Sequence, residues 1–348
     1  METRLKKVHE QVIVITGASS GIGLTTARLA ARKGARLVLA ARSESALQEL
    51  TSEINTGGGQ SVYVVADVSR LEDVQRIAAA ARSAFGSFDT WVNNAAGSIY
   101  GRILDVPLDE ERKLFETNYW GVVYGSRIAA EHLRKRGGAI VNVGSVASDR
   151  AIPLQAAYSA SKHAVKAYTD ALRSELEKDG APVSVTLIKP AAIATPFFRH
   201  AKSYMGAQPT APPPMYAPDV VASAILRAAE HPMRDVLVGG MATFLSAMGR
   251  FFPRAGDKFV KAGMFDGRKS ERLAEPGDNE IFDHPSDDLR ERAEYDVHVC
   301  EMSVYTEASM RPAVKTAAVA LAALGLSMLV ARRLRSRWRS HPASPVSG

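Results

Sequence analysis

Short apolar runs alternate along the chain with longer segments in which apolar residues recur at helical spacing. Seven runs rich in β-branched residues predict strands at 12–16, 37–40, 62–66, 90–93, 140–143, 183–188 and 236–238. Most are apolar at successive positions, which is typical of parallel strands covered on both faces. Helices are predicted between them, for example at 22–33, 72–85, 110–136, 158–178 and 218–230. This alternation predicts an α/β fold, a Rossmann-type doubly wound parallel sheet of about seven strands.

The regular pattern fades after about Phe252. Residues 267–288 are polar and broken by glycine and proline, which indicates a linker or an arm. A second irregular stretch, 208–218, interrupts the body, and it is either a cover over the ligand site or a stiff surface loop. The predicted organisation is a catalytic domain, a polar linker or arm, an apolar C-terminal helix and a basic tail, at 1–255, 256–312, 313–331 and 332–348.

The net charge of +7 first points to a nucleic-acid partner. Seven of the 44 basic residues lie from Ala308 onward, where no acidic residue occurs, so the preceding part carries 37 basic and 37 acidic residues. The positive charge therefore belongs to the tail, and we expect no nucleic-acid partner. Cys300 is the only cysteine, which excludes an intramolecular disulfide and a cysteine-based metal site. We expect no metal, and we expect no secretion, since METRLKKVHE lacks an apolar signal segment.

The first predicted strand leads into a glycine-rich turn, TGASSGIG at Thr16–Gly23, and then into a helix. Glycines let the backbone turn sharply and approach a phosphate, and the N-terminus of the helix offers free N–H groups and a partial positive charge. A glycine-rich turn alone is a weak signal, but its place between the first strand and the first helix strengthens it. The predicted cofactor contacts in this turn are Gly17, Ser19, Ser20, Gly21, Ile22 and Gly23.

The ends of the next strands carry the remaining predicted contacts of a dinucleotide. A fold of this type that prefers NAD usually has an acidic residue at the end of the second strand. This chain has Ala41 there, followed by Arg42 and Ser43, and an arginine can pair with a 2′-phosphate. The sequence thus predicts NADP(H) in preference to NAD(H), unless Arg42 is an ordinary surface arginine. Other predicted contacts, after the third and fourth strands, are Asp67, Val68 and Asn94.

Tyr158 and Lys162 are four residues apart, which places them on the same face of a helix. A tyrosine with a pKa of about 10 is a poor proton shuttle at neutral pH. A neighbouring ammonium group favours the phenolate and so prepares the tyrosine for acid–base catalysis. Ser145, at the end of the fifth strand, can hydrogen-bond a substrate carbonyl, and Asn118 lies further upstream. These four residues are the predicted catalytic group.

Over roughly residues 8–250 the chain resembles the short-chain dehydrogenase/reductase (SDR) family in all these motifs. The resemblance implies that Asn118 supports a water in the proton relay and that Lys162 also binds the nicotinamide ribose. It further implies that the segment 190–195 covers the nicotinamide, with contacts from Pro190, Ile193 and Thr195. Two departures, Ala96 and Ala191, stand where the family has glycine; they could tighten the cofactor site without removing a catalytic group.

The predicted function is an NADP(H)-dependent oxidoreductase that transfers hydride reversibly between the nicotinamide and a carbonyl or secondary alcohol. Tyr158 would protonate the oxygen and Ser145 would stabilise the developing alkoxide. The alternative is a non-catalytic NADP-binding scaffold or redox sensor on the same fold. An apolar small-molecule substrate is predicted from side chains in the segment 197–218, namely Phe197, Phe198, Tyr204, Met205 and Met215. The substrate itself and the physiological direction stay open.

Residues 316–331 carry no charge and are apolar all round, near the short limit for crossing a bilayer. We therefore expect membrane association, with the catalytic domain in the cytoplasm and tethered by its C-terminus; burial in a dimer or against the domain is the alternative. The following five arginines oppose a full crossing, so the segment is either a short tail anchor or a partly inserted helix. Residues 241–252 are either a second membrane-facing piece or a core helix. We also expect a homo-oligomer.

Overall fold

The computed structural model describes residues 4–210, 213–252, 254–258 and 289–310. The chain divides into two compact units, residues 1–306 and residues 307–348. In the second unit the described residues are 307–310. The predicted apolar helix 313–331 and basic tail 332–348, like most of the predicted linker, lie outside the described residues.

A seven-stranded parallel sheet forms the centre of the first unit, with the order β10-β7-β6-β4-β1-β2-β3. The prediction of a doubly wound α/β sheet is confirmed, and each predicted strand is present. The strands are β1 (Val12–Thr16), β2 (Arg36–Ala41), β3 (Gln60–Val65), β4 (Thr90–Asn93), β6 (Gly138–Val143), β7 (Val183–Pro190) and β10 (Asp235–Val238). The chain adds strands first on one side of β1 and then on the other, so the order reverses between β1 and β4.

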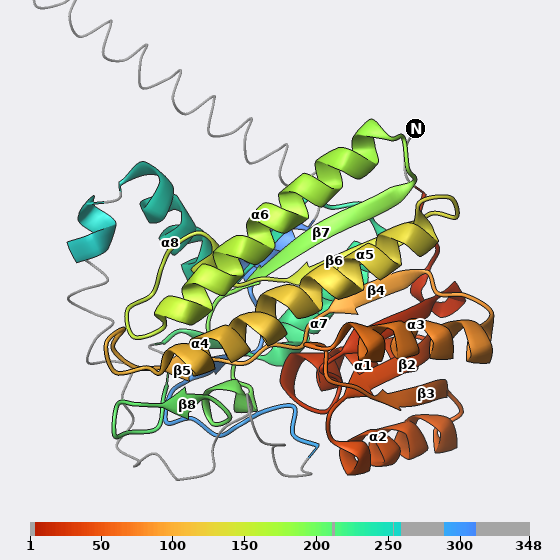
Figure 1. Cartoon of the computed structure of the whole chain (residues 1–348), viewed down its shortest axis with the longest axis horizontal. Helices are drawn as coiled ribbons and strands as arrows, with labels where there is room; N and C mark the ends of the chain where they lie inside the picture. The colour runs from red at the N-terminus through yellow and green to blue at the C-terminus, as the bar shows by residue number, and fades with distance from the viewer. Residues whose placement is uncertain (1–3, 211–212, 253, 259–288, 311–348) are drawn as a thin grey trace, which may run out of the picture. The chain divides into compact units, whose positions relative to one another are not determined.

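Helices cover both faces of this sheet (Figure 1). One face carries α3 (Leu71–Phe85), α4 (Leu108–Phe115), α5 (Gly121–Leu133) and α6 (Ala156–Lys178). On the other face α1 (Gly21–Arg32) packs against α7 (Pro218–Glu230), and α2 (Glu44–Thr56) lies against β3. Short 3-10 turns are η1 (Val8–Glu10), η3 (Val146–Ser148) and η4 (Pro196–Phe198). This cover explains why the strands are apolar at successive positions.

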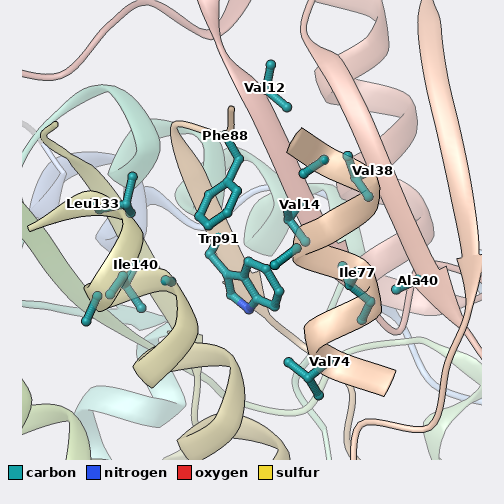
Figure 2. Close-up of a cluster of buried hydrophobic side chains, with 14 of the residues drawn as sticks. Val12, Val14, Val38, Ala40, Val74, Ile77, Phe88, Trp91, Leu133 and Ile140 are labelled. Atoms are coloured by element: carbon teal, nitrogen blue, oxygen red, sulfur yellow. The ribbon is translucent and has the colours of Figure 1, made fainter. Parts of the chain in front are cut away.

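The core between the sheet and the helices α3, α5 and α6 is built around two aromatic side chains (Figure 2). Trp91 of β4 is fully buried, and Phe88 packs edge-on against it with the ring centroids 5.4 Å apart. Valines of β1 and β2 and Ile77 of α3 surround this pair. The core thus holds β4 against β1, the two strands whose carboxyl ends flank the reversal point of the sheet.

The predicted helix at 241–252 is α8 (Gly240–Phe251), and it lies at the surface. Ala242 is buried, but Phe244, Phe251 and Phe252 are exposed, by 47% to 67%. Among the side chains that the structure describes, these exposed phenylalanines do not fit a core helix that is buried all round. The membrane-facing alternative stays a prediction. No helix within the described parts of the chain combines the length and the apolar character that a bilayer span requires.

Two small sheets complete the first unit. One pairs β5 (Ile99–Tyr100) with β8 (Lys202–Ser203), and the other pairs β9 (Met215–Tyr216) with β11 (Val299–Cys300). A last helix, α10, covers Val304–Ser309. The segment that carries β11, drawn in blue in Figure 1, belongs to the first unit and pairs there with β9.

Candidate active site

The glycine-rich turn lies at the carboxyl end of β1, where the strand order reverses and α/β sheets bind their ligands. Gly17 and Gly21 have positive φ angles of 67° and 51°. A Cβ atom on Gly17 would lie 2.8 Å from the Cα of Ala95, and one on Gly23 would lie 1.9 Å from the carbonyl oxygen of Gly17. Only glycine fits these positions, so the first turn of α1 can approach a bound phosphate closely.

Asn94, directly after β4, ties this turn to the neighbouring strand. Its side-chain amide donates hydrogen bonds to the carbonyl oxygens of Thr16 (3.0 Å) and Gly17 (3.1 Å). Its backbone N–H donates to the hydroxyl of Thr16 at 3.1 Å. The two strand ends on either side of the reversal point are thereby held in one rigid edge.

A single groove runs along this edge and brings most predicted cofactor residues together. Those that line it are Gly17, Ser19, Ser20, Gly21, Ile22, Arg42, Ser43, Asp67, Val68, Asn94, Tyr158, Lys162, Pro190, Ile193 and Thr195. Gly23 does not line the groove, because it faces the backbone of Gly17 and serves the packing of the turn. The strand β2 ends at Ala41, and Arg42 and Ser43 directly after it line the groove.

Three of the four predicted catalytic residues also line the groove, namely Ser145, Tyr158 and Lys162. Ser145 follows β6 and caps η3, where its hydroxyl accepts a hydrogen bond from the N–H of Ala147 at 3.1 Å. Tyr158 and Lys162 come from the first turns of α6, and the ammonium nitrogen of Lys162 lies 5.7 Å from the ring centroid of Tyr158. The helical spacing read from the sequence therefore places both groups in one site.

Lys162 is almost fully buried, and its ammonium donates to the carbonyl oxygen of Val143 at 2.9 Å. Burial penalises the charged form and lowers the pKa of this lysine to about 8. Because pH 7 lies below this value, the ammonium is the main form at neutral pH. A positive charge thus stays beside Tyr158.

Asn118 does not line the groove but lies behind it, fully buried. Its side chain accepts from the N–H of Gly97 (2.9 Å), donates to the carbonyl oxygen of Gly97 (2.9 Å) and donates to the hydroxyl of Ser161 (3.2 Å). The predicted helix at 110–136 is present as α4, η2 and α5 in direct succession, and its middle turn, η2 (Glu116–Trp120), is π-helical. Such a turn widens the helix by one residue and is frequent at functional sites; here it contains Asn118.

The part of the groove around Tyr158, where a substrate would bind, is lined by residues of which the sequence predicted only some. Phe197 and Phe198 line it as predicted, and Phe197 lies 5.7 Å from the ring of Tyr158. Tyr204, Met205 and Met215 do not; Met215 is completely buried in a core cluster around Tyr100. Further lining residues are Tyr100, Thr117, Val146, Ile152, Gln155 and His200, which carry no local motif.

No described residue of the irregular stretch 208–218 lines the groove. Its end forms β9, which pairs with β11. This pairing is long-range, and nothing in the local sequence of 208–218 marks it. The described residues of this stretch therefore do not support the prediction that it covers the ligand site.

A buried cluster of charges lies directly after η3. Asp149 accepts hydrogen bonds from Lys189 (2.8 Å) and Ser246 (2.7 Å) and also from Lys166. Burial opposes the negative charge, but these hydrogen bonds outweigh it and lower the pKa of Asp149 to about 2. Because the partners belong to α6, β7 and α8, the cluster joins three elements to the loop that carries Ser145.

The residues that line the groove fit a nicotinamide dinucleotide in their hydrogen-bond donors and charges. The glycine turn would hold the pyrophosphate, Arg42 and Ser43 would hold the adenosine end, and Lys162 would hold the nicotinamide ribose. Within the described ranges no group of three or more His, Cys, Asp or Glu residues is placed to hold a metal ion. The arrangement offers a proton donor, a hydrogen-bond donor and a buried cation at one end of the groove.

Comparisons with known proteins agree with this geometry. A family model described as short chain dehydrogenase matches residues 11–205. The uncharacterized oxidoreductase YxnA of Bacillus subtilis (strain 168) is 47% identical over 320 residues, which cover 91% of this chain and 90% of that protein. The matched region includes all four predicted catalytic residues.

Two solved structures are also similar. A short chain dehydrogenase/reductase from Burkholderia phymatum, in complex with NAD, is 28% identical with a TM-score of 0.63, covering 75% of this chain and 96% of that one. A short chain dehydrogenase from Burkholderia cenocepacia J2315, in complex with NADP, is 27% identical with a TM-score of 0.62, covering 73% and 99%. The fold therefore accommodates either dinucleotide.

Proposed function

Since the chain belongs to the short-chain dehydrogenase family, we propose that it transfers hydride reversibly between NADP(H) and a carbonyl or secondary alcohol. The chain is an oxidoreductase of this family, and similar structures bind NAD or NADP. The observation that carries the finer proposal is the meeting of Ser145, Tyr158 and Lys162 at one end of a groove lined by the glycine turn.

The mechanism follows from the side chains at that end. A bound nicotinamide supplies or accepts the hydride. In the reductive direction, Tyr158 donates its phenolic proton to the carbonyl oxygen, and Ser145 donates a hydrogen bond that stabilises the developing negative charge. Lys162 favours the phenolate left on Tyr158 and holds the ribose. Asn118 holds the π-helical turn against Gly97. The resemblance to the family adds that Asn118 would support a water that returns a proton to the site.

The NADP(H) preference rests on Arg42, which follows β2 and lines the groove. Replacing Arg42 by aspartate is expected to lower the ratio of kcat/KM for NADPH over NADH by roughly 10- to 100-fold, because a charged hydrogen bond is lost and a like charge faces the 2′-phosphate. Steady-state kinetics with both cofactors measures the ratio. Lys135→Asp, the same charge change at an exposed position after α5, is the control. An unchanged ratio would reject the role of Arg42.

An apolar substrate is proposed from the residues at the open end of the groove. Phe197, Phe198, Val146 and Ile152 present hydrocarbon surface there. Such surface favours substrates with an aliphatic or ring body next to the reacting carbonyl. Purified protein tested for NADPH oxidation against a panel of carbonyl compounds would identify the class.

The C-terminal residues 313–331 are proposed as a membrane-associated segment of a cytoplasmic catalytic domain. The uncharged run 316–331 and the arginines that follow it support this proposal. Full-length protein is expected in the membrane fraction of cells, and a chain ending before Arg311 in the soluble fraction. A high-salt wash distinguishes attachment by the arginines alone from an inserted helix, since salt releases arginines from headgroups but does not release an inserted helix. Equal solubility of the two chains would contradict the proposal.

A further inference from the structure

The C-terminal part of the first unit crosses the rim of the groove. We call residues 290–300 the strap; it lies beyond the region matched by the family model. The carbonyl oxygen of Arg290 accepts a hydrogen bond from the N–H of Gly21, the first residue of α1, at 2.9 Å. Glu291 forms an ion pair with Arg28 of α1 at 3.0 Å. One end of the strap is thus bound to α1, the helix whose first residues line the groove.

The middle of the strap is bound to the opposite wall. The hydroxyl of Tyr295 donates to the carbonyl oxygen of Thr195 at 2.5 Å, and its ring packs edge-on against Phe198 at 5.8 Å. The N–H of Ala293 donates to the carbonyl oxygen of Ala194 at 3.3 Å. Burial raises the pKa of Tyr295 far above its ordinary value, so the hydroxyl stays a donor over the working pH range.

The two walls that the strap joins also meet each other. A Cβ atom on Gly21 would lie 3.0 Å from the Cβ of Thr195. Both residues line the groove, whereas no strap residue does. The strap therefore holds the walls together from outside and leaves the space for the dinucleotide open. Its far end is secured as β11, which pairs with β9.

We propose that the strap controls how fast the bound dinucleotide leaves, with Tyr295 as a positioning residue that acts through Thr195. This inference rests on the proposed nicotinamide cofactor. Release requires the wall at 194–198 to move away from the first turn of α1, and the strap opposes that movement because it is bonded to both sides. The ion pair of Glu291 with Arg28 also opposes this movement. Arg28 forms a second ion pair, with Glu53 of α2.

Two strap variants with matched controls test the proposal. Tyr295→Phe removes the hydroxyl and keeps the ring on Phe198, and Tyr305→Phe, outside the strap, is its control. Glu291→Gln weakens the bond from the strap to Arg28, and Glu53→Gln removes the other partner of the same arginine without touching the strap. Stopped-flow fluorescence of NADPH measures the release rate. We expect release to be roughly five-fold faster in Tyr295→Phe and Glu291→Gln, the size of one lost hydrogen bond, and unchanged in both controls.

Hydrogen exchange of the cofactor-free protein gives a second readout. The amide of Gly21 is expected to exchange faster in both strap variants, because its acceptor, the carbonyl oxygen of Arg290, is held less firmly. A lower melting temperature with unchanged NADPH release would show a purely structural brace and overturn the proposal. Absence of NADPH and NADH binding to the wild-type protein would instead overturn the proposed function, and the retention role with it.

Discussion

Tyr158→Phe is expected to lower kcat by roughly 10²- to 10⁴-fold, because the variant loses the general acid–base group of the reaction. The phenyl ring can keep the contact with Phe197 and the packing at the base of the groove. The glycine turn and Lys162 are unchanged, so the affinity for NADPH should stay close to that of the wild type. This combination of lost turnover and retained binding distinguishes a catalytic tyrosine from a damaged fold.

The measurement is NADPH oxidation with a substrate found in the carbonyl panel, together with a fluorescence titration of NADPH. Tyr168→Phe is the control, since Tyr168 lies ten residues further along α6 and contacts Tyr119 instead of the groove. Retention of more than about a tenth of the activity by Tyr158→Phe would contradict the acid–base role. Such a result would favour the non-catalytic scaffold as the function of this fold.

Asp149→Asn is expected to lower the free energy of unfolding by about 3 kcal/mol at pH 7. The variant leaves the ammonium of Lys189, which is 8% exposed, buried without its carboxylate partner. It also weakens the links from Lys166 and Ser246 to the loop that follows Ser145. Urea unfolding measures the change. Asp257→Asn removes the partner of the neighbouring Arg150, but Asp257 is 71% exposed, so this control should change stability by less than about 1 kcal/mol.

The stabilisation by Asp149 should depend on pH with a definite sign. Its pKa is lowered in the folded protein to about 2, from 3.8, so the unfolded chain binds a proton first as the pH falls. The contribution is therefore complete above pH 3.8 and is lost as the pH falls toward about 2. The difference in stability between wild type and Asp149→Asn should narrow over that range. A difference that is the same at pH 7 and at pH 2.5 would show that the charge of Asp149 is not its cause.

Local patterns predicted the parts of the site that depend on neighbours in the chain. The spacing of Tyr158 and Lys162 was sufficient, because residues four apart on a helix always share a face. Gly17 and Gly21 were predictable for a similar reason, since a strand that turns sharply into a helix needs positive φ angles. The substrate end was less predictable: Met215 has the apolar character of a pocket residue, and only the packing decided that it is buried in the core.

The sequence by itself determined the order of strands and helices, the glycine-rich turn and the position of Tyr158 beside Lys162, because each is encoded within a few turns of backbone. The tertiary structure alone decided the π-helical turn that holds Asn118 on Gly97, the three partners of Asp149 and the contact of the strap with Gly21 and Thr195. These contacts join residues between 17 and 269 positions apart. The periodicity of apolar residues predicts only local structure and gives no information on contacts between residues so far apart in the chain. These contacts form only once the sheet has brought the segments together.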